Sequence, residues 1–259
     1  MPAAAPELSL AYRTVQARRA AVIAALVARY YQTRVDVEDP SSVKRWLDIL
    51  LPRILGGRRD SAVLAAAYGN KIRDIEIPGD KAFSFTPVAD IEEAVVRASL
   101  SIVGPGSLTS QMAKINKLDV PETSKQALIK QATASTATAV KGATFRHVAN
   151  GGRQTILEGA KADKLALGYV RVTRDHPCFF CALLASRGLV YDEHSFDDSD
   201  PRFTGDGTVK VHDSCQCGLK PAYNRADPLL DRSKEWNAMW YRTGSLLAFR
   251  QEYEGRAKD

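Results

Sequence analysis

Cysteine is scarce in this chain: 259 residues contain four, and all of them lie between positions 178 and 217. Long apolar runs are also missing. The apolar stretch at residues 20–28 is far shorter than the roughly 20 residues of a membrane-spanning helix, and no clear signal-peptide cleavage site follows it before Arg29. We therefore expect no membrane segment and no export signal. Without export, crowded cysteines are expected to be reduced thiols rather than disulfides.

No strong charge bias is present either. The formal net charge is +6, from 36 basic and 30 acidic residues spread along the chain. Such a mild excess permits contact with nucleic acid or an acidic partner without requiring one. A hydrophobic content of 45% is enough for a real core and argues against disorder throughout.

Most of the chain before residue 164 predicts helices. Residues 15–30 predict an amphipathic helix, with Val15, Val22, Leu26 and Tyr30 facing the core and the neighbouring arginines facing water. Glycine and proline predict the ends of successive helices at Asp39-Pro40, Gly56-Gly57, Pro78-Gly79, Pro87, Gly104-Pro105-Gly106 and Pro121. A long helix is predicted from Pro121-Glu122 to Asn150-Gly151-Gly152, followed by a short helix over residues 154–163. Its small-residue segment at 131–140 favours close packing, either within the monomer or against another subunit.

The residue composition changes after residue 164. Residues 165–173 have strand composition, with Tyr169 and Arg171 on the face opposite Val170 and Val172. Shorter strands are predicted at 189–191, 209–211 and 218–220, around an acidic loop. A last helix is predicted to begin at Asp227-Pro228 and to bury Trp236, Met239 and Trp240 at helical spacing. Together these patterns predict an α+β fold: a mainly helical region (1–160), a small zinc-stabilised α+β module (161–225) and a C-terminal helix (226–259).

The cysteines form a pattern typical of a metal site. Cys178 and Cys181 make a Cys-x-x-Cys pair, and His212, Cys215 and Cys217 make a His-x-x-Cys-x-Cys set about thirty residues later. Two separated ligand pairs can close a tetrahedron around one ion, and thiolate and imidazole ligands favour zinc over magnesium or calcium. Five candidates compete for four positions. Cys178, Cys181 and Cys217 are the natural three, and either Cys215 or His212 is the fourth; we slightly favour four thiolates. Both closed sets favour a structural zinc ion.

Catalysis has little support in the sequence. A thioredoxin-like redox pair would leave the second ligand pair unexplained. A zinc-dependent nucleobase deaminase shares Pro177-Cys178-x-x-Cys181, but its upstream His-x-Glu is missing. A hydrolase triad could be assembled on paper from Ser186, His194 and His212, yet no Gly-x-Ser-x-Gly elbow is present.

The cysteine region resembles the MuF-like minor head proteins of tailed bacteriophages, especially those of phages of actinobacteria. The resemblance covers about residues 165–223 and is carried by two stretches: Asp-His-Pro-Cys-Phe-Phe-Cys-Ala-Leu-Leu-Ala-Ser-Arg-Gly-Leu-Val-Tyr at 175–191 and Val-His-Asp-Ser-Cys-Gln-Cys at 211–217. The resemblance implies a minor capsid protein that associates with the portal protein and other head proteins and acts in head assembly and DNA packaging or ejection. It also implies a place in the virion, at the portal vertex or capsid interior, after assembly in the host cytoplasm.

Two alternatives to a structural virion protein stay open. Relatives in actinobacterial phages often carry the label of capsid maturation protease, and a zinc-dependent enzyme acting on nucleic acid is the second alternative. If the chain is a head component, basic residues such as Arg53, Arg58, Arg59 and Lys71 could make non-specific contact with packaged DNA.

Overall fold

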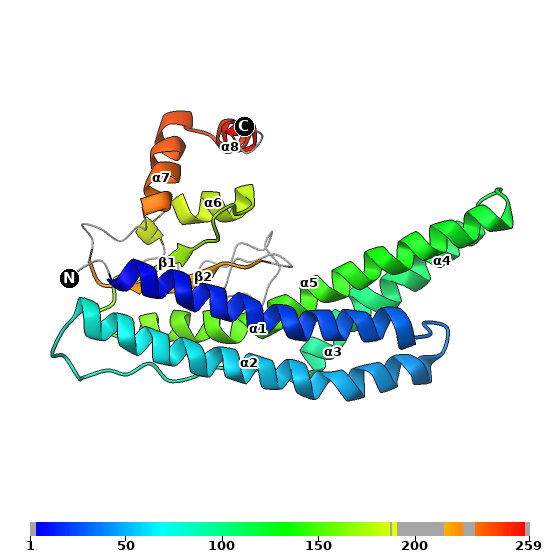
Figure 1. The fold of residues 1–259 in the computed structure, drawn as a ribbon, viewed down its shortest axis with the longest axis horizontal. Coiled ribbons are helices and arrows are strands. Elements are labelled where there is room, and N and C mark those ends of the chain that lie inside the picture. The colour runs from blue at the N-terminus through cyan, green and yellow to red at the C-terminus, as the bar shows by residue number, and fades with distance from the viewer. Residues whose placement is uncertain (1–3, 187, 191–214, 225–230, 257–259) are drawn as a thin grey trace.

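The computed structural model describes residues 4–186, 188–190, 215–224 and 231–256. This part of the chain is mostly helical, with one small two-stranded sheet (Figure 1). The elements follow in this order: α1 (Ala4–Arg34), α2 (Pro40–Glu76), α3 (Glu93–Ser101), η1 (Ile102–Gly106), α4 (Ser107–Asn116), α5 (Glu122–Ala162), β1 (Gly168–Val172), α6 (Phe179–Ser186), η2 (Gly188–Val190), β2 (Gly218–Ala222), α7 (Asp231–Thr243) and α8 (Leu246–Arg256).

Helices α1, α2 and α5 pack side by side and form the helical body. One hydrophobic cluster joins the C-terminal half of α1, the N-terminal half of α2 and the middle of α5 with α3 and α4, around Trp46, Ile54 and Val140, which are almost fully buried. Figure 1 shows α4 and the N-terminal part of α5 projecting from this body as a helical hairpin. Helices α6, α7 and α8 lie near the opposite end, beside the sheet.

Helix α1 exists as predicted, but its buried face is not the predicted one. Its core face consists mainly of alanine and tyrosine, with Tyr12, Ala20, Ala24 and Tyr31 buried beside Val27. Of the four predicted core residues, Val15, Val22 and Leu26 are exposed, whereas Tyr30 is half-buried and packs against the core. Alanine allows the backbones of α2 and α5 to approach closely, so close packing decided the orientation that side-chain hydrophobicity alone predicted wrongly.

Two of the helix breaks predicted before residue 121 are absent. Helix α2 runs through Gly56-Gly57 without interruption, and a Cβ atom at Gly57 would lie 2.2 Å from Cδ1 of Ile23 on α1. Glycine at that position therefore serves contact between helices. The chain also stays helical through Gly104-Pro105-Gly106, where η1 is a π-helical turn. A π turn is one way in which a helix absorbs a proline that cannot donate its backbone hydrogen bond.

Helix α5 is a single helix, so the predicted stop at Asn150-Gly151-Gly152 and the separate short helix at 154–163 are wrong. A Cβ atom at Gly151 would lie 2.1 Å from the backbone oxygen of Arg58 on α2. One at Gly152 would lie 2.1 Å from Nε2 of Gln16 on α1. The glycines bring α5 into close contact with both neighbours. This packing outweighs the free-energy cost of glycine inside a helix, which is about 1 kcal/mol per residue relative to alanine.

Substituting alanine at two helical glycines should therefore have opposite effects. Gly151→Ala is expected to lower the free energy of unfolding by at least about 2 kcal/mol, because the new methyl group meets a backbone oxygen that cannot move without separating α2 from α5. Gly56→Ala, where no atom lies within 4 Å of the new Cβ, should raise it by about 0.5–1 kcal/mol. Urea denaturation of both variants measures the difference. Equal effects would contradict the close approach at Gly151.

Strands β1 and β2 pair antiparallel, with Gly168 opposite Ala222 and Val172 opposite Gly218. They confirm the predicted strands at 165–173 and 218–220. All five residues of each strand are buried, so the alternation of side chains does not expose one face to water. The strand predicted at 189–191 is wrong for Leu189, which lies in the short 3-10 turn η2. The predicted strand at 209–211 lies outside the described residues.

The described C-terminal part has two helices where one was expected. Helix α7 ends before Gly244, which has a positive φ of 65°, a conformation that suits glycine at the end of a helix. Trp236 and Met239 are buried against α6 and Phe249 of α8, which confirms core packing for this aromatic segment. The predicted start at Asp227-Pro228 lies outside the described residues.

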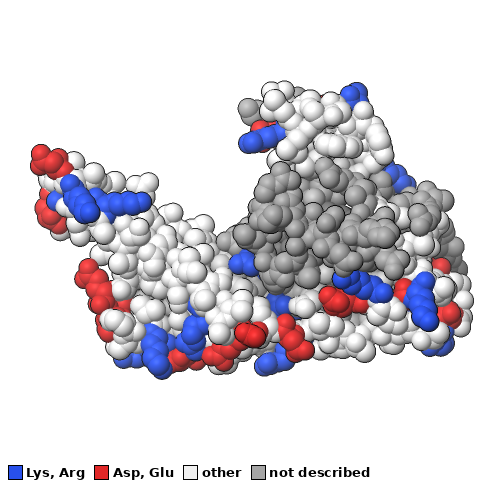
Figure 2. Space-filling view, turned by 180° about the vertical axis from the view of Figure 1, so that it is seen from behind, with Lys and Arg blue, Asp and Glu red and all other residues white. Residues whose placement is uncertain are grey.

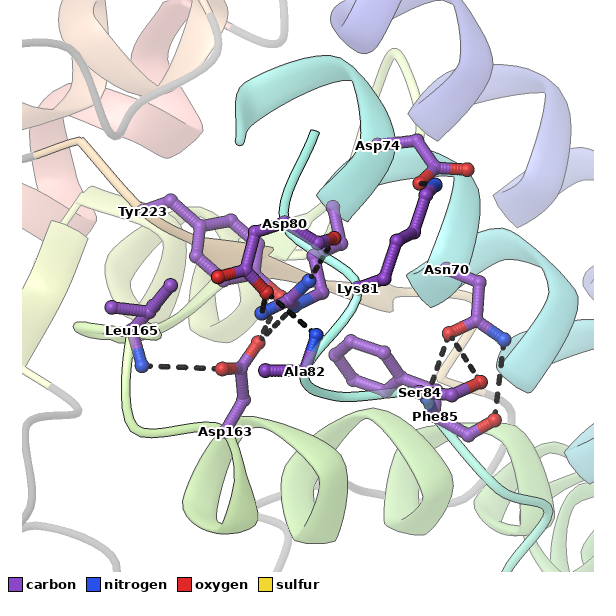
Figure 3. A network of polar contacts seen from close by, with 11 residues as sticks. Asn70, Asp74, Asp80, Lys81, Ala82, Ser84, Phe85, Asp163, Leu165 and Tyr223 are labelled. Atoms are coloured by element: carbon purple, nitrogen blue, oxygen red, sulfur yellow. Dashed lines mark hydrogen bonds and ion pairs between the residues drawn. The ribbon is translucent and has the colours of Figure 1, made fainter. Parts of the chain in front are cut away.

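A buried ion-pair network holds the ends of α2 and α5 to the residue after β2 (Figure 3). The Arg73 guanidinium donates to Asp163 (Nε to Oδ2, 2.7 Å) and to Asp80 (Nη2 to Oδ1, 2.6 Å). The Tyr223 hydroxyl donates to the same Asp163 oxygen at 3.0 Å, and the backbone N–H of Leu165 donates to its other oxygen at 3.1 Å. Hydrogen bonds from the Ala82 backbone and then from Arg73 hold the pKa of Asp80 below its usual value. This network fixes the approach of the chain to β1 and its exit from β2.

Candidate metal centre

The topology of the small sheet explains why distant cysteines meet. Because β1 and β2 are antiparallel, the end of β1 and the start of β2 lie at the same edge, where Val172 faces Gly218. Cys178 and Cys181 follow β1, with Cys181 in the first turn of α6, while Cys215 and Cys217 immediately precede β2. Strand pairing therefore places the Cys178–Cys181 pair and the Cys215–Cys217 pair at the same edge of the sheet.

Three sulfur atoms form a compact cluster. The Sγ atoms of Cys181, Cys215 and Cys217 all lie within 4.8 Å of one another, and the Cys181–Cys215 Sγ–Sγ distance is 3.6 Å. Thiolates bound to one tetrahedral zinc ion are about 3.8 Å apart, given Zn–S bonds of about 2.3 Å. A disulfide needs about 2.05 Å, and all four cysteines are free thiols. These three buried cysteines are close enough to hold a metal ion.

Cys178 lies beside this cluster. The backbone N–H of Cys181 points to the Cys178 sulfur at 3.4 Å, an arrangement that orients the sulfur across the first turn of α6. Cys178 is only half-buried and is not in the mutually close set of three. His212, the alternative fourth ligand, lies outside the described residues. Four thiolates, or three thiolates and His212, both stay predictions.

Two buried arginines surround the sulfur cluster. Arg153 of α5 donates from Nε to the Cys217 carbonyl at 3.0 Å, from Nη2 to the Cys215 carbonyl, and from Nη1 to Oδ1 of Asn150 at 2.7 Å. Arg171 of β1 places Nη1 4.0 Å from the Cys215 sulfur. Positive charges at these positions offset the negative charge that several thiolates would bring into a buried site.

The electrostatics of the thiols favour partial ionisation. Hydrogen bonds from the Cys181 and Cys217 thiols, together with the charges of Arg153 and Arg171, hold the pKa of Cys215 well below its usual value. Hydrogen bonds shared with Cys178, Cys215 and Cys217 raise the pKa of Cys181. A metal ion would replace the remaining shared protons, because metals bind thiolates rather than thiols.

The arginines were missed by the sequence interpretation. Arg153 follows what looked like a helix stop, so nothing in its local sequence predicted contact with the cysteines. Arg171 was assigned to one face of a strand, and only the pairing of β1 with β2 places it against Cys215. The one usable signal was a charged residue inside an otherwise apolar strand.

The described residues give no support to a hydrolase triad of Ser186, His194 and His212. Ser186 is fully buried, and its hydroxyl donates to the Leu183 carbonyl of its own helix at 2.7 Å. His194 and His212 lie outside the described residues. His147 is buried within α5, while His176 is an exposed residue before α6.

The predicted basic surface is partly wrong. Arg53, Arg59 and Lys71 are exposed, but Arg58 is 1% exposed. Its guanidinium donates to the Ala89 carbonyl at 3.0 Å, to the His147 carbonyl at 3.0 Å and to Oε1 of Gln154 at 2.6 Å. Arg58 is therefore a core residue that joins α2 to α5. Figure 2 shows acidic and basic side chains interspersed along one face, instead of a single basic field.

None of the described helices is both long and apolar enough to cross a membrane.

Comparison with known proteins identifies the family to which the chain belongs. No curated protein and no solved structure matches the chain. The model of the VG15 protein family matches residues 5–243, which include the helical body, the sheet and the cysteine cluster. The chain therefore belongs to the VG15 protein family, a viral family whose membership indicates a virion-related phage protein.

Proposed function

We propose that this chain is a minor capsid protein of a tailed phage, bound at the portal and active in head assembly and in DNA packaging or ejection. The observation that carries the proposal is the VG15 family match over residues 5–243, joined to the MuF-like cysteine pattern at 175–191 and 211–217. The helical hairpin of α4 and α5 adds an exposed element that reaches away from the body (Figure 1). Such a projection suits contact with a ring of other subunits.

Binding to the portal protein of the same phage tests this proposal. The full chain is mixed with assembled portal rings and analysed by size-exclusion chromatography with light scattering. We expect the chain to elute with the ring at a fixed ratio. If it binds neither the portal nor the major capsid protein, the proposed place in the head is wrong.

The protease alternative has a separate test. Purified chain is incubated with the capsid and scaffold proteins of the phage, and the products are followed by mass spectrometry. A structural protein leaves both substrates intact. Cleavage that disappears on substitution of one serine or histidine would favour the maturation protease, and hydrolysis of phage DNA would favour the zinc-dependent enzyme.

We further propose that the cysteine cluster holds one structural zinc ion, with Cys178, Cys181, Cys215 and Cys217 as ligands. The closeness of the Cys215 sulfur to the sulfurs of Cys181 and Cys217 supports the four-thiolate set, and the adjacent arginines suit its negative charge. Zinc would cross-link the start of α6 to the start of β2 and leave no open coordination position for a substrate.

Metal analysis of two variants distinguishes the ligand sets. Inductively coupled plasma mass spectrometry should find one zinc ion per chain in the wild type and in His212→Ala, whereas Cys215→Ala should lose most of the metal. The reverse result, with His212→Ala losing zinc and Cys215→Ala retaining it, would assign the fourth position to His212.

Arg171 is predicted to support metal binding without being a ligand. Arg171→Met removes the charge 4.0 Å from the Cys215 sulfur and should weaken zinc affinity about tenfold or more, as is common for residues that contact metal ligands. Competition with a chromogenic chelator gives the affinity. Arg174→Met, at an exposed position just after β1, is the control and should keep wild-type affinity. Equal affinities for all three proteins would refute a role for Arg171.

A further inference from the structure

Helix α1 has a second apolar face that points away from the core. Val22 is 71% exposed, Leu26 is 42% exposed and Val15 is 39% exposed. Their spacing of seven and four residues places them on one stripe along the helix. The opposite face of the same helix is buried through alanines and tyrosines against α2 and α5. Val15, Val22 and Leu26 therefore lie on the side that no described element covers.

Arginines flank this stripe on both sides. At 100° per residue, Arg18 and Arg29 lie along one edge of it and Arg19 along the other. All three are exposed, and none makes an ion pair with a described carboxylate. Helix α1 contains one acidic residue, Glu7, near its N-terminus. The face is thus an apolar stripe with unneutralised positive charge on each edge, which we call the α1 outer face (Val15, Arg18, Arg19, Val22, Leu26 and Arg29).

We propose that the α1 outer face is a docking site for an amphipathic helix of a partner protein, with an apolar stripe bordered by glutamate or aspartate. A helix in this position would cover Val15, Val22 and Leu26 by side-chain packing, while its acidic flanks pair with Arg18, Arg19 and Arg29. This is the arrangement of helix pairs in which apolar residues make the seam and flanking charges choose the partner. From Val15 to Arg29 the face spans about 21 Å, which corresponds to about four helical turns of the partner.

Charge and hydrophobicity argue against other occupants. A second copy of the chain would bring three arginines against three arginines across the same seam, which is unfavourable. Duplex DNA would satisfy the arginines but would leave the aliphatic stripe without apolar contacts. An anionic membrane surface would accept both, yet helices that bind there usually insert larger apolar faces with aromatic residues.

The first experiment uses two synthetic helical peptides of about four turns, labelled with a fluorophore. Both carry leucine at seam positions; one has glutamate at flanking positions and the other has lysine. Fluorescence anisotropy with the full chain should show binding of the glutamate peptide at least about tenfold tighter than of the lysine peptide, and weaker binding as salt rises. No binding of the glutamate peptide, or equal binding of both peptides, would overturn the proposal.

Variants locate the binding and test both parts of the face. The pair Val22→Ser with Leu26→Gln and the triple change Arg18→Gln, Arg19→Gln and Arg29→Gln should each weaken peptide binding about tenfold or more. The control variants Val63→Ser and Arg53→Gln change exposed residues of α2 and should bind as wild type. Circular dichroism and the thermal midpoint should match wild type in every variant, because all positions are exposed.

Duplex DNA and anionic vesicles serve as competing probes. If either binds the wild type more tightly than the glutamate peptide does, and the arginine variant loses that binding, the α1 outer face belongs to that ligand and the proposal is wrong. Peptide binding that survives both sets of variants would place the site elsewhere and also overturn it. These results are independent of portal binding, which can succeed or fail separately.

Discussion

Cys217→Ser is expected to prevent binding of the proposed zinc ion and to lower the free energy of unfolding of the protein by at least about 3 kcal/mol. Cys217 is 5% exposed and belongs to a hydrophobic cluster that also contains Tyr12 of α1, Ala65 of α2 and Ile156 of α5. Loss of the cross-link therefore disturbs the packing of the helical body as well as the sheet. Urea denaturation followed by tryptophan fluorescence measures the loss.

A chelator separates the metal contribution from the change of sulfur to oxygen. In excess chelator the difference in free energy of unfolding between wild type and Cys217→Ser should mostly disappear, because a ligand stabilises the folded protein only while free ligand is present. The remaining difference should be about 1 kcal/mol, the size expected of a small polar substitution in a core. Two findings would refute the structural zinc ion: a wild type whose stability does not respond to chelation, and a Cys217→Ser variant that is as stable as wild type.

Arg73→Met is expected to lower the free energy of unfolding by about 3–5 kcal/mol, because it leaves the buried carboxylate of Asp163 without its counter-charge. The side chains of both residues are almost fully buried, at 4% and 2% exposure. Methionine fills much of the volume of arginine, so the expected loss comes from the charge. Tyr223 and Leu165 still donate to Asp163, but neutral donors do not replace a guanidinium.

An exposed ion pair nearby provides the control. Lys81→Met breaks the 2.7 Å pair with Asp74, which stands in solvent close to the buried network (Figure 3). Because exposed pairs contribute about 0–1 kcal/mol, this variant should be nearly as stable as wild type. The double variant Arg73→Met with Asp163→Asn should recover part of the lost free energy of unfolding, since it removes the buried carboxylate that Arg73→Met leaves without a counter-charge. Equal stability of Arg73→Met and Lys81→Met would contradict the network.

Helix content could be predicted better than helix boundaries. The long helical segments before residue 164 were recognised from composition and spacing, and so were the strands that became β1 and β2. The errors fell on glycine: Gly56-Gly57 and Gly151-Gly152 looked like helix ends but lie inside α2 and α5. Local propensity costs such residues about 1 kcal/mol each, and the contacts that Gly57, Gly151 and Gly152 allow with neighbouring helices outweigh that cost. Those contacts involve residues of other helices that are far away in the sequence, so no local pattern encodes them.

At the candidate metal centre, the spacing of the cysteines predicted the candidate ligands, but nothing in the sequence predicted the residues that surround them. Four cysteines in two close groups predicted a shared site, and three of their sulfurs lie within 4.8 Å of one another. Arg153 comes to the site from a helix and Arg171 from a strand, and neither belongs to the cysteine pattern. Charge compensation in a buried site depends on which elements pack together, which is a property of the whole fold.

The sequence by itself determined the scarcity and clustering of cysteine, and with it the expectation of a metal site, because thiol spacing restricts chemistry directly. It also determined that most of the chain is helical. Only the tertiary structure decided that antiparallel pairing of β1 and β2 joins the two cysteine groups. It likewise decided that Arg58 is a core residue and that Val22 and Leu26 of α1 face outward. The physical reason is that each helix face competes with all others for burial: on α1 the face with alanines and tyrosines packs against α2 and α5, and Val22 and Leu26 on the other face remain exposed.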